Sequence, residues 1–297
     1  MTVQMPSQKL PLQGRRGRLP DLSDAEFGRW RELLEARAGI RLSPQRKPLF
    51  LSGLRARMRE VGCEDYQTYY EQLSQRDSVP EWAILIDRLT VHETRFFRDP
   101  DALRLIETRL LPGFVADSRR SLQAWSLGCA SGEEAYSLAM LLDHALPAGS
   151  APRFGITATD ISRPALAAAR QGEYARRRLD GIPETYRRHY CETVSEQRFR
   201  IAPRLRRRIC FSPLGIADLE RFPLDGFDLV YCQNVLIYFD RSERHGILDR
   251  LADRLAPGGM LVLAPGDVLH WSHPQLERVR CEGTLAYQRR VDPEVRD

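Results

Sequence analysis

A strand, a glycine-rich turn and a helix follow one another over residues 121–146, and this succession constrains the fold more than any other feature of the sequence. The stretch SLQAWSLG is typical of a strand that ends at Gly128, and EEAYSLAMLLDHAL is typical of the helix after the turn. Strands and helices continue to alternate, with further strands expected at FGITATD, RRRICF, FDLVYC and MLVLAP. Alternation of this kind from about residue 100 predicts an α/β domain with a mostly parallel sheet.

The rest of this region contains one insertion and a C-terminal group of elements. Residues 172–208 are arginine-rich, are broken by Gly and Pro, and fit the alternation poorly, so we predict a small inserted β subdomain at about 172–208. The helix SERHGILDRLADRL is expected to end at Pro257-Gly258-Gly259, which is a stop signal. The C-terminal stretch LERVRCEGTLAYQRR can supply a final pair of strands.

Residues 21–90 have the hydrophobic spacing of a helical domain. Ser23 and Glu26 form a capping-box signature before the first of four apolar stripes. The stripes comprise Phe27, Trp30 and Leu34, then Leu51, Leu54, Met58 and Val61, then Tyr66, Tyr69, Tyr70 and Leu73, and finally Trp82, Leu85, Ile86 and Leu89. Four short amphipathic helices predict a small bundle. Residues 1–20 lack periodicity and are expected to be a mobile tail.

The composition describes a globular chain with an excess of positive charge. The formal net charge is +5, which suits an acidic partner without identifying one. No apolar run approaches the roughly 20 residues that cross a bilayer, and the N-terminus lacks the apolar segment of a secretory signal, so we expect a cytoplasmic protein without membrane insertion. The six scattered cysteines and six histidines show no metal-ligand spacing, which predicts free thiols and no metal.

The turn after the first strand is a candidate ligand site. Small residues in Leu127-Gly128-Cys129-Ala130-Ser131-Gly132 allow a ligand to approach the backbone, and the helix N-terminus offers N–H groups to a carboxylate. Glu133 and Glu134 follow and could face a cation. The spacing G-x-x-x-G is not the dinucleotide pattern G-x-G-x-x-G. Asp160 ends the next strand, where an acidic residue can bind ribose hydroxyls or simply cap a helix. Together these features favour a nucleoside ligand.

Two further polar stretches are expected to reach the same site. CQNVLIYFD, residues 232–240, follows a strand, and ligands of doubly wound sheets bind at the carboxyl ends of strands. HETRFFRD, residues 92–99, lies at the junction of the helical and α/β regions, where pockets often form. An arginine in such a pocket could hold a carboxylate substrate.

Five motifs occur along the chain in this order: LTVHETRFFRD, WSLGCASGEEAYSLAM, ATDIS-x5-A-x2-GEY, FDLVYCQNVLIYFD and LAPGGML. The chemotaxis receptor methyltransferases, the CheR family, have the same motifs in the same order. The sequence resembles this family from about residue 22 to 290. The resemblance implies an all-α N-terminal domain, a Rossmann-like class I methyltransferase domain and an inserted β subdomain. It divides the chain into a receptor-recognition domain at 21–90, a linker at 91–100 that contributes to the active site, and an S-adenosylmethionine-binding domain at 101–297.

The resemblance also implies roles for individual residues. Arg98 and Tyr238 match the family's arginine and tyrosine near the transferred methyl group. Arg55, Arg57 and Arg59 resemble the family's receptor-binding arginines. The cofactor contacts map onto His92, Thr94, Arg98, Glu134, Asp160, Gly215, Ile216, Cys232 and Gln233.

Several positions depart from the family pattern. His92 and Gly215 each replace an asparagine, and Gln233 replaces an arginine. Ala135 replaces a proline, and Gly266-Asp267 stand where the family has Ser-Glu. We expect cofactor binding to survive these changes.

The resulting expectation is a monomeric enzyme that uses S-adenosylmethionine to form glutamate methyl esters on chemosensory receptors, in flagellar, pilus or another pathway. Two alternatives remain open. The basic stretches 176–178 and 204–208 could support RNA, or a small molecule could be the acceptor, although no aromatic stacking platform accompanies those arginines and no nucleic-acid partner is expected. Alternatively, the departures could mark a cofactor sensor or scaffold that transfers no methyl group.

Overall fold

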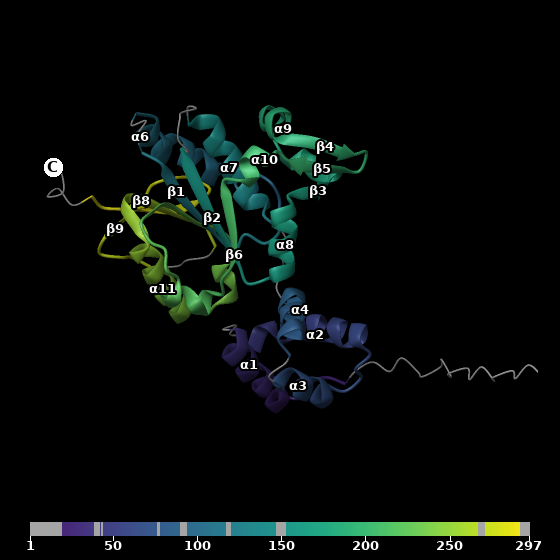
Figure 1. Cartoon of the computed structure of the whole chain (residues 1–297). Coiled ribbons are helices and arrows are strands. Elements are labelled where there is room, and N and C mark those ends of the chain that lie inside the picture. The colour runs from purple at the N-terminus through teal and green to yellow at the C-terminus, as the bar shows by residue number, and fades with distance from the viewer. Residues whose placement is uncertain are drawn as a thin grey trace, which may run out of the picture.

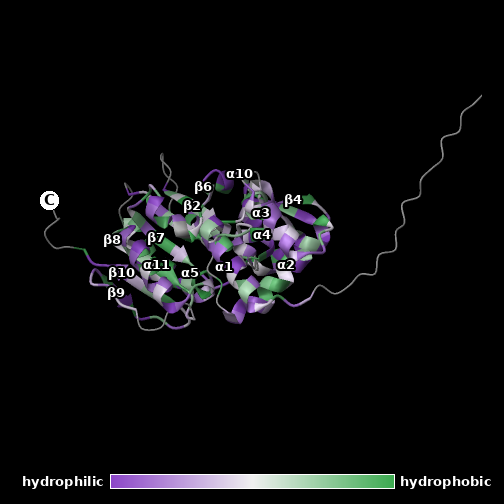
Figure 2. Cartoon of the chain, turned by 90° about the horizontal axis from the view of Figure 1, so that it is seen from below, coloured by the Kyte–Doolittle hydropathy of each residue, from purple (hydrophilic) through white to green (hydrophobic). Residues whose placement is uncertain are grey.

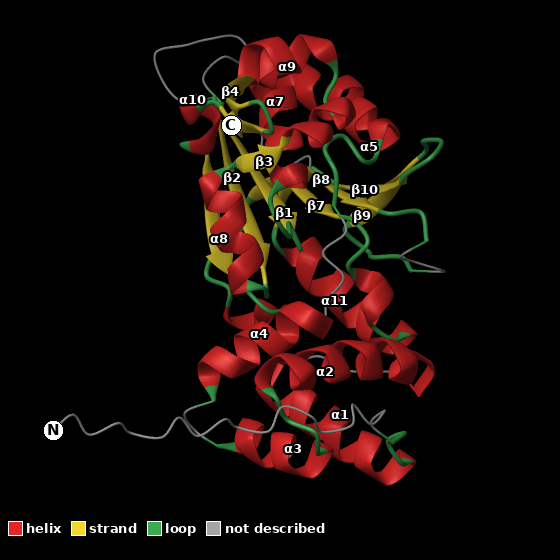
Figure 3. Cartoon of the chain, turned by 90° about the vertical axis from the view of Figure 1, so that its right-hand side faces the viewer, coloured by secondary structure: helices red, strands yellow, loops and turns green. Residues whose placement is uncertain are grey.

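The computed structural model describes residues 20–38, 42, 44–75, 78–89, 94–116, 120–146, 153–266 and 271–291. Within these ranges the chain forms a helical lobe and a sheet-containing lobe, stacked one above the other in Figures 1 and 3. Residues 1–19 of the expected tail, and His92, lie outside the described residues.

The helical lobe contains the four predicted helices, α1(Asp24–Ala38), α2(Lys47–Val61), α3(Tyr66–Ser74) and α4(Val79–Leu89). The capping box ahead of α1 is confirmed: Glu26 N lies 3.2 Å from Ser23 Oγ, and Ser23 N lies 2.8 Å from Glu26 Oε2. Hydrophilic and hydrophobic residues lie next to one another along these helices in Figure 2. Their apolar residues form one buried cluster around Trp30, although Val61 of the second predicted stripe is 41% exposed.

The second lobe is built on a seven-stranded sheet in the order β6-β2-β1-β7-β8-β10-β9. Its strands are β1(Leu122–Leu127), β2(Phe154–Asp160), β6(Ile209–Pro213), β7(Phe227–Cys232), β8(Leu255–Leu263), β9(Leu276–Val279) and β10(Leu285–Arg289). The five strands from β6 to β8 run parallel, whereas β10 is antiparallel to both neighbours. The predicted Rossmann-like architecture is confirmed.

Helices cover both faces of this sheet because neighbouring strand residues point to opposite sides. Leu122 and Ala124 of β1 pack in the cluster that holds α7(Glu133–Ala145). Trp125 and Leu127 pack in the cluster that holds α11(Arg241–Asp253). The remaining α-helices described in this lobe are α5(Pro100–Leu105), α6(Leu111–Ala116), α8(Arg163–Gln171), α9(Glu184–Tyr190) and α10(Pro203–Arg206).

The inserted segment forms a separate three-stranded antiparallel sheet in the order β3-β5-β4. Its strands are β3(Glu173–Ala175), β4(Cys191–Ser195) and β5(Arg198–Ile201). It also contains the short helices α9 and α10, so the insertion is partly helical. It lies beside α7 and away from the helical lobe (Figure 1).

One expected boundary is wrong. Pro257-Gly258-Gly259 does not end the preceding helix, because α11 already ends at Asp253 and strand β8 starts at Leu255. The two glycines lie inside the strand, where its register against β7 shifts between Phe227 and Leu229. A Cβ on Gly259 would lie 2.7 Å from the Phe227 carbonyl oxygen, so close backbone approach explains the glycine.

Candidate functional site

The turn after β1 is held against the end of β2 by backbone hydrogen bonds. Gly128 N and Cys129 N both donate to the Thr159 carbonyl oxygen, at 2.7 and 3.0 Å. Gly128 has φ +78°, and a Cβ there would lie 2.3 Å from Val235 Cγ2 in the loop after β7. Glycine therefore allows the loops after two neighbouring strands to meet at the carboxyl edge of the sheet.

Asp160 fixes this turn with its side chain. One carboxylate oxygen accepts from Ala130 N and the other from Ser162 N, both at 2.8 Å. Asp160 does not cap the following helix, because the Ser162 hydroxyl accepts from Ala165 N at the start of α8. Each carboxylate oxygen has a second lone pair, so Asp160 can also accept hydroxyl groups from a ligand.

A cavity of about 620 Å³ opens beside this turn, between the strand ends and the helical lobe. Its volume falls in the range of small-molecule sites. Seven of the sequence-predicted site residues line it: Thr94, Arg98, Glu134, Asp160, Ile216, Gln233 and Tyr238. Gly215 and Cys232 are not among its lining residues, and Cys232 lies fully buried in the core beside Gln233.

The two glutamates of the turn have separate environments. Glu133 is buried and forms an ion pair with Arg178 of the inserted segment. Glu134 lines the cavity and accepts a hydrogen bond from Ser126 Oγ at 2.6 Å. Burial raises the pKa of Glu134 to about 8, against the opposing effects of the Ser126 hydrogen bond and the Arg98 charge. A ligand cation beside Glu134 would favour the ionised form of its carboxyl group. The part of the cavity wall at Glu134 therefore suits an ammonium or sulfonium group.

Gln233 offers a buried donor to the same cavity. The residue is 7% exposed, and its side-chain Nε2 has no hydrogen-bond partner among the described residues. Leaving a buried amide unpaired costs free energy, which a ligand acceptor would recover. The unpaired Gln233 donor, the Glu134 carboxyl and the Asp160 carboxylate together fit a ligand that carries acceptors, a cation and hydroxyl groups, as S-adenosylmethionine does.

The segment before α5 is anchored to the helix that follows the glycine-rich turn. Phe97 has φ +50°, its N–H donates to Ser137 Oγ at 2.9 Å, and its ring stacks on Tyr186. Asp99 caps α5 by accepting from Ala102 N. These contacts fix the backbone on both sides of Arg98, at the cavity wall.

The helical lobe also supplies part of the wall, which the sequence did not predict. Arg46 lines the cavity, with its guanidinium carbon 4.6 Å from the centre of the Tyr238 ring. Arg46 Nη2 donates to the Ile237 carbonyl oxygen at 2.6 Å. Leu49 and Phe50 line the cavity as well. In the sequence, Arg46 belongs to an arginine-rich stretch at 46–59, and such a stretch by itself is typical of a solvated face.

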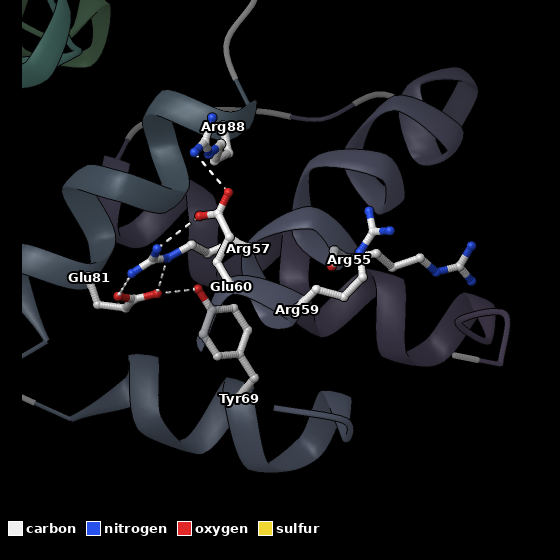
Figure 4. Close-up of polar contacts among 7 residues, drawn as sticks. All are labelled: Arg55, Arg57, Arg59, Glu60, Tyr69, Glu81 and Arg88. Atoms are coloured by element: carbon white, nitrogen blue, oxygen red, sulfur yellow. Dashed lines mark hydrogen bonds and ion pairs between the residues drawn. The ribbon is translucent and has the colours of Figure 1, made fainter. Parts of the chain in front are cut away.

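The three predicted receptor-binding arginines do not line the cavity and differ in their contacts. Arg57 bonds to Glu81 and Glu60 within the helical lobe (Figure 4). Arg55 donates to the Tyr66 hydroxyl, at 2.6 Å, and to Asp21, at 2.8 Å. Arg59 is exposed and donates only to the Arg55 carbonyl oxygen, one helical turn away, among the described residues. Figure 4 shows Arg55 and Arg59 pointing away from the Arg57 network.

The sheet is Rossmann-like with an antiparallel strand next to its edge, and the cavity lies at the carboxyl ends of its parallel strands. This is the architecture of an S-adenosylmethionine-dependent methyltransferase. The family comparisons agree with this class. Residues 92–284 match the model for the CheR methyltransferase, SAM binding domain, and residues 25–90 match the CheR methyltransferase, all-alpha domain. The chain belongs to the CheR methyltransferase family.

Curated relatives match along most of their length. Chemotaxis protein methyltransferase 1 of Pseudomonas aeruginosa is 31% identical over 276 residues, covering 90% of this chain and 98% of the relative. The chemotaxis protein methyltransferase of Escherichia coli is 32% identical over 246 residues, covering 81% and 83%. The chain is therefore a chemotaxis methyltransferase that uses S-adenosylmethionine. No described helix is long and apolar enough to cross a bilayer.

Proposed function

We propose that this enzyme forms glutamate 5-O-methyl esters on the cytoplasmic part of methyl-accepting chemosensory receptors. The observation that carries the proposal is a single cavity with two kinds of wall. Asp160, Glu134 and Gln233 provide the features of a nucleoside amino-acid site, while Arg98 and Tyr238 add a cation and a phenol. Arginine is well suited to a carboxylate, so an acidic side chain is the acceptor that this wall fits best.

Catalysis needs no general base in this proposal. A glutamate carboxylate has an unperturbed pKa of about 4.3 and is ionised at pH 7. Asp160, Glu134 and Gln233 would hold S-adenosylmethionine, which would supply a methyl group on a sulfonium. Transfer of that methyl group to the carboxylate oxygen would break its bond to sulfur and leave the bonding pair on sulfur. The protein contributes alignment of the carboxylate and exclusion of water.

Within this scheme Arg98 orients the acceptor carboxylate, and Tyr238 shapes the surroundings of the methyl group. The anchoring of Phe97 and Asp99 supports the assignment of Arg98, because it holds the backbone around that residue in one position. Too tight a pairing with Arg98 would weaken the carboxylate as a nucleophile, so its contribution is positional.

Recognition of the receptor is assigned to the helical domain at 21–90. Of its three candidate arginines, Arg59 fits a contact with an acidic receptor surface best, because Arg55 and Arg57 already bond to carboxylates of their own domain. The proposed enzyme acts as a cytoplasmic monomer.

The first test is transfer of radiolabelled methyl from S-adenosylmethionine to the cytoplasmic fragment of a receptor from the same genome. We expect base-labile label on glutamate, and a sharp loss of turnover with Arg98→Ala. Cofactor binding without any label on receptors would instead favour a sensor, or another acceptor such as RNA. Near-normal receptor methylation by Arg98→Ala would refute the role of that residue.

A further inference from the structure

Arg46 belongs to the helical lobe but makes its side-chain contacts with the other lobe. It directly precedes α2, yet its guanidinium lies over Tyr238, a residue of the other lobe that follows β7. The bond to the Ile237 carbonyl, at 2.6 Å, fixes the guanidinium at this place. One of the five N–H donors of the guanidinium is used in this bond.

Arg46 has no ion-pair partner among the residues that the structure describes. No Asp or Glu in that part of the chain pairs with it, whereas the neighbouring Lys47 pairs with Asp24 at 2.7 Å. Its two partners among the described residues, an aromatic ring and a carbonyl oxygen, carry no net charge and so do not balance the positive charge of the guanidinium at the cavity wall. A guanidinium in this setting is a ready partner for an entering carboxylate.

Arg46 also lies beside the more exposed residues of the cavity wall. Two cavity residues next to it, Leu49 and Ile237, are 46% and 39% exposed. In contrast, Asp160 and Gln233 on the cofactor side are each 7% exposed. A glutamate side chain reaching in from a receptor helix would therefore meet Arg46 and Tyr238 before it reached the deeper residues.

We propose that Arg46 is a substrate-binding residue that receives the carboxylate of the receptor glutamate and presents it beside Tyr238. This inference deepens the proposed function and rests on it. One consequence is that the helical lobe completes the acceptor site, in addition to recognising the receptor surface. The exposed apolar side chains of Leu49 and Ile237 would then contact the receptor backbone or small side chains that flank the target glutamate.

The test compares Arg46→Met, Arg46→Lys and Lys47→Met in the full-length enzyme, with the receptor fragment as substrate. Lys47→Met is the matched control, because it removes the same charge from the next residue, which does not line the cavity. Binding of S-adenosylhomocysteine and thermal unfolding report the integrity of each variant.

We expect Arg46→Met to raise the KM for receptor and to lower kcat/KM by about 10- to 100-fold, the usual range for a lost hydrogen bond to a charged group. Its affinity for S-adenosylhomocysteine should stay within about twofold of wild type, in keeping with a partner that is not the cofactor. Arg46→Lys should be intermediate, because lysine keeps the charge but not the planar fork.

Three results would overturn the assignment of Arg46. Equal kcat/KM for Arg46→Met and Lys47→Met would show that only general charge matters. A loss of kcat with an unchanged receptor KM would show that Arg46 acts on Tyr238 alone. If Arg46→Met lost stability and cofactor affinity in parallel, Arg46 would be a structural contact between the two lobes and not a substrate-binding residue. Transfer of base-labile methyl by the wild-type enzyme tests the proposed function separately. If the wild-type enzyme transferred no such methyl, both proposals would be overturned. If it did, and Arg46→Met were unaffected, only the proposal about Arg46 would be overturned.

Discussion

The Arg57 guanidinium donates two hydrogen bonds to the Glu81 carboxylate, from Nε to Oε1 at 2.9 Å and from Nη2 to Oε2 at 2.7 Å (Figure 4). The Tyr69 hydroxyl donates to the same Oε1 at 2.6 Å. These contacts join α2, α3 and α4, and the Arg57 side chain is only 15% exposed. Arg57 therefore stabilises the helical domain, even though the sequence places it beside Arg59 as a receptor contact.

We expect Arg57→Met to lower the free energy of unfolding by about 2–3 kcal/mol at pH 7, because it leaves Glu81 partly buried without its cation. The hydrogen bond from Arg57 holds the pKa of Glu81 below its usual value. A lowered carboxyl pKa gives stability that is present above the unfolded-state pKa and lost as the pH falls. The difference between variant and wild type should therefore shrink below about pH 4.5, as measured by urea unfolding.

Arg59→Ala is the matched control for Arg57→Met. Its stability should stay within about 0.5 kcal/mol of wild type, as expected for an exposed side chain. Its KM for receptor should rise, whereas Arg57→Met should lose methylation only in proportion to its unfolded fraction. A normal receptor KM for Arg59→Ala would contradict the assignment of this residue to the receptor surface.

The sequence predicted the layout of the chain well because its signals are local. Period-3.6 stripes, the Ser23 capping box and alternating strands each depend on residues close together in the chain. The error at Pro257-Gly258-Gly259 had a different origin. Gly259 is required by the approach of Phe227 from a neighbouring strand, and such a contact leaves no local pattern.

The candidate site was predictable only in part for the same reason. Motif resemblance found Asp160 and Glu134, whose side chains line the cavity. It could not separate Arg57 from Arg59, because the distinction depends on Glu81, which lies 24 residues away in sequence from Arg57. Nor could it find Arg46, whose partners Ile237 and Tyr238 belong to the other lobe.

Asp160 is predicted to serve both the turn and the cofactor. Asp160→Asn keeps one carbonyl oxygen but replaces the other acceptor with an NH₂ group, which faces either Ala130 N or Ser162 N. We expect cofactor affinity to fall at least about tenfold, with a loss of stability of roughly 1–3 kcal/mol. Equilibrium binding and denaturant unfolding measure the two effects, and unchanged values for both would exclude this role.

Gln233→Met should separate stability from ligand affinity. The substitution removes a buried donor that has no partner among the described residues, so the ligand-free protein should gain up to about 1 kcal/mol of stability. Affinity for S-adenosylhomocysteine should fall about tenfold if the amide donates to the ligand. A variant with unchanged affinity would show that Gln233 faces the cavity without binding the cofactor.

Glu134 makes cofactor binding depend on pH. In the ligand-free protein burial raises the pKa of Glu134 to about 8, so this carboxyl is mostly protonated at pH 7. A ligand ammonium or sulfonium favours the carboxylate, and binding at pH 7 should therefore release a proton to the buffer. Calorimetric titration with S-adenosylhomocysteine in two buffers of different ionisation enthalpy measures that proton directly.

The same shift sets the sign of the stability change with pH. Because the folded-state pKa of Glu134 lies above its unfolded value, its contribution to stability is complete below about pH 4.5 and is lost as the pH rises through about 8, by at most about 1.4 kcal/mol per pH unit. Glu134→Gln should remove this slope and the released proton together, leaving only the titration of the ligand's own amine. If Glu134→Gln still released the proton that wild type releases, another group would be its source. That result would contradict the proposal that the ligand cation lies beside Glu134.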